Sequence, residues 1–113
     1  MQTQIENLLE NIKADYINWT THNGTKEISS YSQGQIDAFD DNVEVKHGKK
    51  YIKIVGGVSS GVWGFIVASE NDKKFQVGDI LMAAGWRGPA RNKARGNVLS
   101  GNFGSRWTGP NYL

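Results

Sequence analysis

The N-terminal region of the chain has the residue spacing of an amphipathic helix. Apolar side chains recur there at intervals of three and four residues, which places them along one face of a helix. They are Ile5, Leu8, Leu9, Ile12, Tyr16 and Trp19. Asn23-Gly24 follows, and glycine tolerates the left-handed backbone that commonly ends a helix. We expect a helix that ends at this pair. Its wide aromatic stripe would pack on a sheet, on a second subunit or on both.

From Lys26 to Phe75 the pattern becomes that of β-strands. Apolar and polar residues alternate over 43–45 and 51–55, on either side of a turn, as in a β-hairpin. The apolar run VWGFIVAS, which starts at residue 62, suits a strand covered on both faces, and FQVGDIL closes the region. Upstream, the more ambiguous segment KEISSYSQGQIDAFDD predicts one or two short strands.

The C-terminal third reads as two short helices followed by strands. Asp79 can cap a helix over residues 80–84, and Gly88-Pro89 can start a second one that Gly96 ends, since proline suits the first helical position. A helix of about two turns needs tertiary support or a ligand. The remaining tail predicts a final strand or two. We therefore expect one α+β domain over residues 1–113, with an N-terminal amphipathic helix, an antiparallel sheet and a short helix in the C-terminal region.

The composition is that of an ordinary globular protein and excludes several classes of site. Of 113 residues, 38% are hydrophobic and 21% are charged, and no apolar run approaches the roughly 20 residues of a membrane span. The chain contains no cysteine, which excludes disulfides, thiol nucleophiles and thiolate metal sites. Glu6 and Glu10 make the N-terminus unlike a signal peptide, so we expect a cytoplasmic protein with no membrane partner.

Charge is distributed unevenly along the chain. Residues 1–79 contain eight Lys and Arg against eleven Asp and Glu, whereas residues 80–113 contain five Lys and Arg and no acid. A basic segment of this kind indicates an anionic partner or, more simply, a solvated basic face.

The segment GWRGPARNKARGN concentrates this positive charge. Arg91 and Arg95 are four residues apart and would share one face of the expected helix. Arg87, just before that helix, is a further candidate ligand-binding residue. Two neighbouring guanidinium groups suit a pyrophosphate, because each can donate two parallel hydrogen bonds. Either Asn92 or Asn97 could read a polar edge of a base. The N-terminus of the helix would attract phosphate. The alternative is an exposed basic helix without a ligand.

Aromatic residues could supply a stacking surface for a base. Trp63 and Phe65 would point to the same face of a regular strand, and Trp86 lies beside the arginines in sequence. One exposed ring could stack on a nucleobase for roughly 1–3 kcal/mol. In so small a domain, however, most of these rings should belong to the core.

The sequence supports catalysis poorly. His22 and His47 lie in turn-like segments without metal-ligand spacing, and the glycine-rich loop at 56–61 lacks the Gly-Lys-Ser/Thr end of a P-loop. Asp40-Asp41 and Glu44 could bind a metal, although a charged surface turn explains them more simply. We therefore interpret the chain as a binding protein, not an enzyme, with no cofactor and no metal.

With these residues in view, the chain resembles the phage Thoeris anti-defence sponge proteins of the first-described type. The resemblance covers nearly the whole chain. It depends on the small size of the protein and on the expected order of an amphipathic N-terminal helix, an antiparallel sheet and a short helix. It also depends on ARNKARGN, with two arginines one helical turn apart, and on the aromatic strand VWGFIV. That family implies dimers or hexamers that sequester cyclic ADP-ribose isomers without cleaving them, and some members also hold cyclic oligonucleotides.

The resemblance implies that Arg91 and Arg95 of this sequence bind the phosphates of the ligand. It also implies that an aromatic residue such as Phe65 stacks on adenine and that Asn92 forms hydrogen bonds with a polar edge of the ligand. Trp63 and Trp86 are rival stacking residues. A single-stranded nucleic-acid-binding module is the alternative, because basic residues interleaved with aromatics are typical of such proteins. An inhibitor that blocks a host enzyme through exposed aromatics is a third hypothesis.

Overall fold

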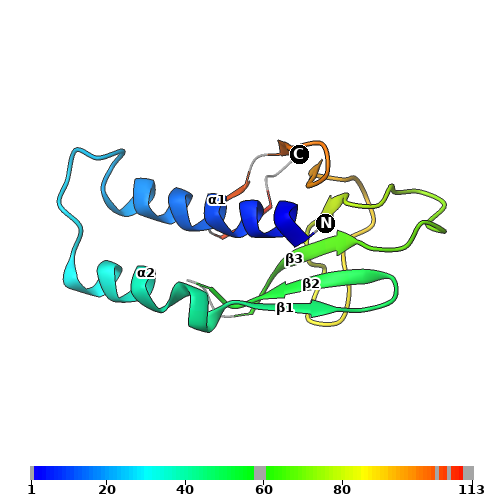
Figure 1. Ribbon diagram of the computed structural model, residues 1–113, viewed down its shortest axis with the longest axis horizontal. Helices are drawn as coiled ribbons and strands as arrows, with labels where there is room; N and C mark the ends of the chain where they lie inside the picture. Colours follow the sequence, from blue (N-terminus) through cyan, green and yellow to red (C-terminus); the bar gives the residue numbers. More distant parts are fainter. Residues whose placement is uncertain (1, 58–60, 104, 107, 111–113) are drawn as a thin grey trace.

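The computed structural model describes residues 2–57, 61–103, 105–106 and 108–110 (Figure 1). Two helices, α1 (Gln2–Thr20) and α2 (Ser30–Asn42), precede all the strands in the chain. Helix α1 buries the predicted stripe through Ile5, Leu8, Ile12 and Tyr16, whereas Trp19 is 61% exposed. Gly24 has a positive φ of 88°, as expected for the turn that follows the helix. The predicted N-terminal helix is thus confirmed.

Helix α2 corrects the prediction of one or two short strands upstream of Val43. Ser29 caps the helix, since its hydroxyl accepts a hydrogen bond from the Ser32 amide at 3.1 Å. Phe39 is the buried anchor of the helix, at 1% exposure. The polar, glycine-containing sequence of α2 carries little helical pattern of its own, so the helix depends on Phe39 packing into the core that α1 and the sheet form.

The strands form a four-stranded antiparallel sheet in the order β1-β2-β3-β4. Its members are β1 (Glu44–His47), β2 (Tyr51–Val55), β3 (Val62–Val67) and β4 (Ile80–Leu81). Both the predicted hairpin and the predicted apolar strand are confirmed. Strand β4 replaces the short helix expected over residues 80–84, because its backbone pairs with β3 through Phe65↔Leu81 and Ile66↔Ile80.

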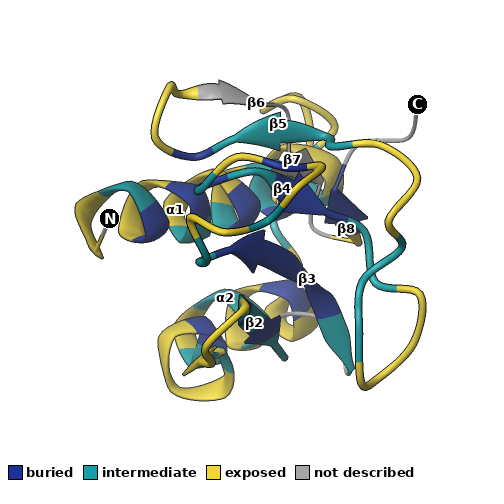
Figure 2. Cartoon of the chain, turned by 90° about the vertical axis from the view of Figure 1, so that its right-hand side faces the viewer, coloured by how far each residue is buried: buried dark blue, intermediate teal, exposed yellow. Residues whose placement is uncertain are grey.

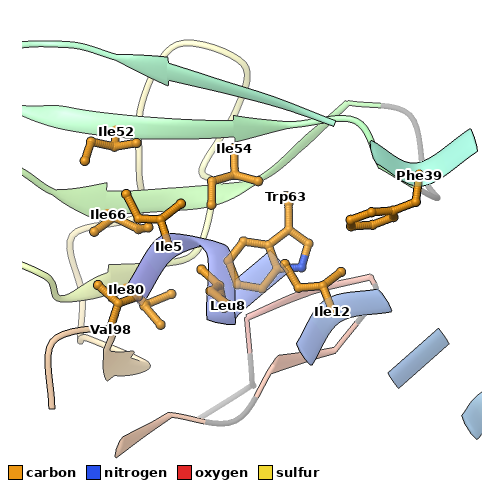
Figure 3. Close-up of a cluster of buried hydrophobic side chains, with 10 residues drawn as sticks. All are labelled: Ile5, Leu8, Ile12, Phe39, Ile52, Ile54, Trp63, Ile66, Ile80 and Val98. Atoms are coloured by element: carbon orange, nitrogen blue, oxygen red, sulfur yellow. The ribbon is translucent and has the colours of Figure 1, made fainter. Parts of the chain in front are cut away.

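One face of the sheet packs against the helices and holds the larger core (Figure 3). Ile54, Ile66 and Ile80 meet side chains from α1 and Phe39 there. The Trp63 indole also lies on this face, which contradicts the expected common orientation of Trp63 and Phe65. The register between β2 and β3 shifts after Ile54, so Trp63 is the extra residue of a β-bulge and turns toward the helices.

The opposite face carries a smaller core of Phe65, Val67, Phe75 and Leu81. The segment 82–95 packs on it through Ala83 and Ala94. In Figure 2 the buried colour concentrates in the sheet interior and on the inner sides of the helices, while the loops are largely exposed. Both faces of β3 are therefore covered, as its sequence predicts.

The described part of the tail contains short strands, more of them than the one or two that the sequence predicts. They are β5 (Gly96–Asn97), β6 (Asn102–Phe103), β7 (Ser105–Arg106) and β8 (Gly109–Pro110), paired as β5-β6 and β7-β8. Part of this prediction falls on residues 104, 107 and 111–113, which lie outside the described residues. The predicted α+β class is confirmed, with both helices in the N-terminal half. In the described part of the chain, neither helix has the length and hydropathy to cross a membrane.

Candidate functional site: a lysine-lined pocket

Two lysines face each other across the β1–β2 hairpin. Lys46 and Lys53 are register partners, and the same cross-strand row continues through Phe65 and Leu81 on the face opposite the helices. Like charges directly opposite each other in a sheet are destabilising. An anion bound between them would remove this repulsion.

A pocket with a cavity of about 490 Å³ opens beside this pair. The hairpin turn and the adjacent strands supply most of its lining, which is Lys46, His47, Gly48, Lys49, Lys50, Tyr51, Lys53, Phe65 and Arg87. We call this cavity the lysine pocket. Its size falls within the usual range of small-molecule sites, about 300–1,000 Å³.

The lysine pocket is strongly cationic. Four lysines and Arg87 line it, and among the described ion pairs only Lys46 has a carboxylate partner, Glu44 at 3.7 Å. Both members of that pair are more than half exposed, so solvent screens it and it neutralises little charge. The pocket can therefore attract a multiply charged anion.

The exposed loop around Trp86 forms one side of the site. The Lys53 Nζ lies 4.1 Å from the centre of the Trp86 ring, and the Lys46 Nζ lies 6.0 Å from it. Trp86 is 56% exposed, so its ring remains available to a ligand. Phe65, in contrast, is 3% exposed and belongs to the core beneath the pocket. The geometry favours Trp86 over Phe65 as the stacking residue, and Trp63 is buried against the helices.

The helix predicted between Gly88 and Gly96 is absent. Its segment instead folds back on β4, where Ala90 donates a hydrogen bond to the Met82 carbonyl and Arg95 donates one to the Ile80 carbonyl, both at 2.7 Å. Ala83 and Pro89 form an isolated β-bridge. These tertiary hydrogen bonds outweigh the small local preference for a two-turn helix. The shared helical face of the arginine pair, on which the resemblance partly depended, is therefore not present.

Arg91 takes part in an internal ion pair with Asp72. Its Nη1 and Nη2 donate to the two Asp72 carboxylate oxygens at 2.9 and 3.0 Å, and Nη1 also donates to the Tyr51 hydroxyl. We call Asp72, Arg91 and Tyr51 the arginine latch, because they fasten the 82–95 segment to β2 and to the loop before Phe75. Arg91 does not line the lysine pocket; it lines an adjacent cavity of about 420 Å³.

Arg95 and Asn92 also have partners within their own segment. The Arg95 guanidinium donates to the Lys93 carbonyl at 3.2 Å and to the Asn92 Oδ1 at 3.4 Å. Asn92 Oδ1 accepts from the Lys93 amide as well. Of the six predicted ligand-binding residues, Phe65, Arg87 and Trp86 thus lie at the lysine pocket, whereas Arg91, Asn92 and Arg95 do not line it.

Sequence reasoning missed the four lysines, although a signal existed. The stretch KHGKKYIK brackets the predicted turn, and pairing outward from that turn places Lys46 opposite Lys53. The arginine-rich segment drew attention because it lacks acids nearby in sequence. Its compensating acid, Asp72, lies 19 positions before Arg91 and becomes its neighbour only through the fold.

No protein-family model, curated protein or solved structure matches this chain. Within the described residues, no group of three or more His, Asp or Glu side chains gathers in a way that could hold a metal ion.

The arginine latch predicts a specific dependence of stability on pH. The hydrogen bonds from Arg91, and those from the Phe75 and Lys74 amides, hold the pKa of Asp72 far below its usual range. Below about pH 4, an ordinary aspartate pKa, the unfolded chain binds a proton at Asp72 that the folded chain does not. This part of the stability is complete above that pH and is lost as the pH falls.

We therefore expect Asp72→Asn to lower the Tm at neutral pH and to make the decline of Tm between about pH 5 and pH 2 shallower than in the wild type. Thermal unfolding followed by circular dichroism across this range measures both effects. Asp41→Asn, which removes an exposed carboxylate from α2, is the control and should keep the wild-type profile. Identical profiles for all three proteins would contradict the latch.

Proposed function

We propose that this protein binds a phosphate-bearing cyclic nucleotide in the lysine pocket and sequesters it without cleaving it. The supporting observation is the convergence of four lysines and Arg87 on one cavity, with Glu44 as the only carboxylate paired to them among the described ion pairs. Phosphate oxygens would accept charge-assisted hydrogen bonds from these groups. The exposed Trp86 ring supplies a surface for a base.

The resemblance to the Thoeris anti-defence sponges makes a cyclic ADP-ribose isomer the first ligand to test. Such a ligand carries a pyrophosphate and an adenine, which match a cluster of cations beside an exposed indole. On this proposal the protein is a phage anti-defence factor that acts in the host cytoplasm as a homo-oligomer, a dimer or a hexamer. Cyclic oligonucleotides are further candidate ligands for the same chemistry.

The direct test is incubation with cyclic ADP-ribose isomers, followed by filtration and then by heating of the retained protein. Sequestration predicts that the free ligand is depleted and that heating returns it chemically unchanged, as measured by mass spectrometry. Recovery of a hydrolysed product would overturn the proposal and indicate an enzyme. His47, which lines the pocket, would then be the first candidate for a general base.

Single-stranded nucleic acid is the second candidate ligand. It is favoured by the basic surface that continues from the lysine pocket through Lys50 into the adjacent cavity, where Lys73 also lies. An extended strand would use both cavities, whereas a small cyclic ligand would need one. Oligonucleotide affinity that exceeds that of the cyclic ligand and falls steeply with salt would favour this second function.

A further inference from the structure

Strand β1 is an open edge of the four-stranded sheet. In the order β1-β2-β3-β4 it has β2 on one side, and none of the described strands pairs with its other side (Figure 1). Glu44, Lys46 and His47 are exposed, whereas Val45 is partly buried against the larger core. An uncovered edge presents unpaired backbone groups and can therefore serve as a template for a further strand.

The register shows which backbone groups of β1 point outward. The Gly48 amide donates a hydrogen bond to the Tyr51 carbonyl at 2.9 Å, so these two residues form a hydrogen-bonded pair. Hydrogen-bonded and non-hydrogen-bonded pairs alternate along an antiparallel ladder. Lys46 therefore directs its N–H and C=O groups toward β2, whereas Val45 and His47 direct theirs away from β2.

A second β1 strand, antiparallel to the first and centred on Val45, fits these outward groups. The Val45 amide of each copy would donate to the Val45 carbonyl of the other, and the His47 amide would donate to the Val43 carbonyl of the other copy. The Val43 amide is already used within its own chain, where it donates to the Phe39 carbonyl at 2.9 Å. The outward N–H groups of β1 thus all find acceptors in this arrangement.

Side-chain charge selects this register over its neighbour. Side chains two residues apart share a face of the strand, so centring on Val45 places Glu44 of one copy directly opposite Lys46 of the other. These would be non-hydrogen-bonded pairs, in which opposing side chains lie closest. Moving the centre to Lys46 would also pair the backbones, but it would place Lys46 opposite Lys46, and such like-charge pairs are destabilising.

The second copy would also contribute a side chain to the lysine pocket. Lys46 has Lys53 opposite it on the β2 side, and on the open side it would have Glu44 of the second copy. That carboxylate would offset the repulsion between the two lysines, which Glu44 of the same chain, 3.7 Å from Lys46, does only weakly. The two pockets would open on the same face of the extended sheet.

We infer that two copies of this chain join their β1 strands, antiparallel and centred on Val45, into one continuous sheet. The two-fold axis makes the contact between Glu44 and Lys46 occur twice. In strand addition of this kind, main-chain hydrogen bonds supply affinity and side chains supply specificity. The inference specifies an interface for the homo-oligomer of the proposed function, on which it rests only in that respect, and it does not depend on the nucleotide.

Charge reversal at Glu44 and at Lys46 tests this register. Glu44→Lys opposes two lysines and Lys46→Glu opposes two glutamates, so each variant alone should be monomeric. An equimolar mixture should form a heterodimer, because the lysines of one chain then face the glutamates of the other. Both positions are exposed, so both variants should retain the fold, which circular dichroism verifies.

Sedimentation equilibrium without nucleotide measures the masses. The wild type should reach twice the chain mass of 12.5 kDa as its concentration rises. The matched control is Glu27→Lys, which makes the same change of charge at an exposed position in the connection between α1 and α2 and should remain dimeric.

Amide hydrogen exchange, followed by nuclear magnetic resonance, locates the contact. The Val45 and His47 amides should exchange slowly in the dimer, and dilution to the monomer should speed their exchange at least tenfold. The Lys46 amide, which faces β2, is the reference and should respond much less to dilution.

Three results would overturn the inference. The first is a wild type that has the mass of a single chain at every concentration, which would also remove the homo-oligomer from the proposed function. The second is a dimer that Glu44→Lys leaves intact or whose Val45 and His47 amides exchange rapidly, since another surface would then join the copies. The third is a mixture of the two variants that remains monomeric. Because no nucleotide is present, none of these results bears on ligand binding in the lysine pocket.

Discussion

Reversing two charges in the lysine pocket, through Lys53→Glu together with Arg87→Glu, should reduce affinity for a cyclic ADP-ribose isomer at least 100-fold. Each position can supply a charge-assisted hydrogen bond, worth about 1.5–3 kcal/mol, and 1.4 kcal/mol corresponds to about tenfold in affinity. Introduced carboxylates would add repulsion toward phosphate. Isothermal titration of wild type and variant measures the loss directly.

A matched control changes the net charge by the same amount elsewhere. Lys26→Glu with Lys93→Glu alters two exposed lysines that do not line the pocket and should retain most of the affinity. Equal losses in both variants would mean that only the overall charge attracts the ligand. Unchanged affinity in the pocket variant would show that the lysine pocket is not the ligand-binding site.

Arg91→Ala tests whether the ligand binds in the lysine pocket or through the arginine-rich segment. The fold assigns Arg91 to the latch with Asp72 and Tyr51, so its loss should loosen the 82–95 segment more than it weakens direct contact with phosphate. A loss of affinity as large as that of the pocket variant, with unchanged thermal stability, would instead indicate that Arg91 contacts the ligand directly.

Replacing Trp63 by alanine should produce the largest loss of stability, about 3–5 kcal/mol. The indole is 3% exposed and packs among Ile54, Phe39 and the buried face of α1, so its removal leaves a cavity between the helices and the sheet (Figure 3). Urea denaturation measures the change in the free energy of unfolding. A domain of this size should also lose roughly 4–8 °C in Tm for each kcal/mol.

Trp86→Ala is the control, because that indole is 56% exposed and substitution of an exposed side chain usually changes stability by no more than about 0.5 kcal/mol. The two tryptophans should behave oppositely in binding. Trp86→Ala should weaken nucleotide binding, whereas Trp63→Ala should affect binding only through the loss of folded protein. A small loss of stability in Trp63→Ala would contradict its placement in the core.

Elements with a regular apolar period were predictable from the sequence. The stripe from Ile5 to Tyr16 determines the first helix, since it gives that segment one face to bury. The alternation around the turn at 47–49 determines the hairpin, and the continuous apolar run from Val62 determines a strand covered on both sides. The sequence also predicted a cationic site, but it assigned that site to the arginine-rich segment and not to the lysines of the hairpin.

Contacts between residues distant in sequence determined helix α2, the orientation of Trp63, the path of segment 82–95 and the location of the cationic site. Helix α2 has a weak local pattern and forms because Phe39 reaches the shared core, and the bulge at Trp63 reverses an orientation that strict alternation would assign to it. Segment 82–95 does not form the predicted short helix, because its backbone forms hydrogen bonds with Ile80 of β4 and with Met82, which follows β4. Asp72 neutralises Arg91 from 19 positions away, while Lys46 and Lys53 are brought face to face. Sequence spacing reports local geometry, but whether a charge is neutralised depends on which distant groups the fold places beside it.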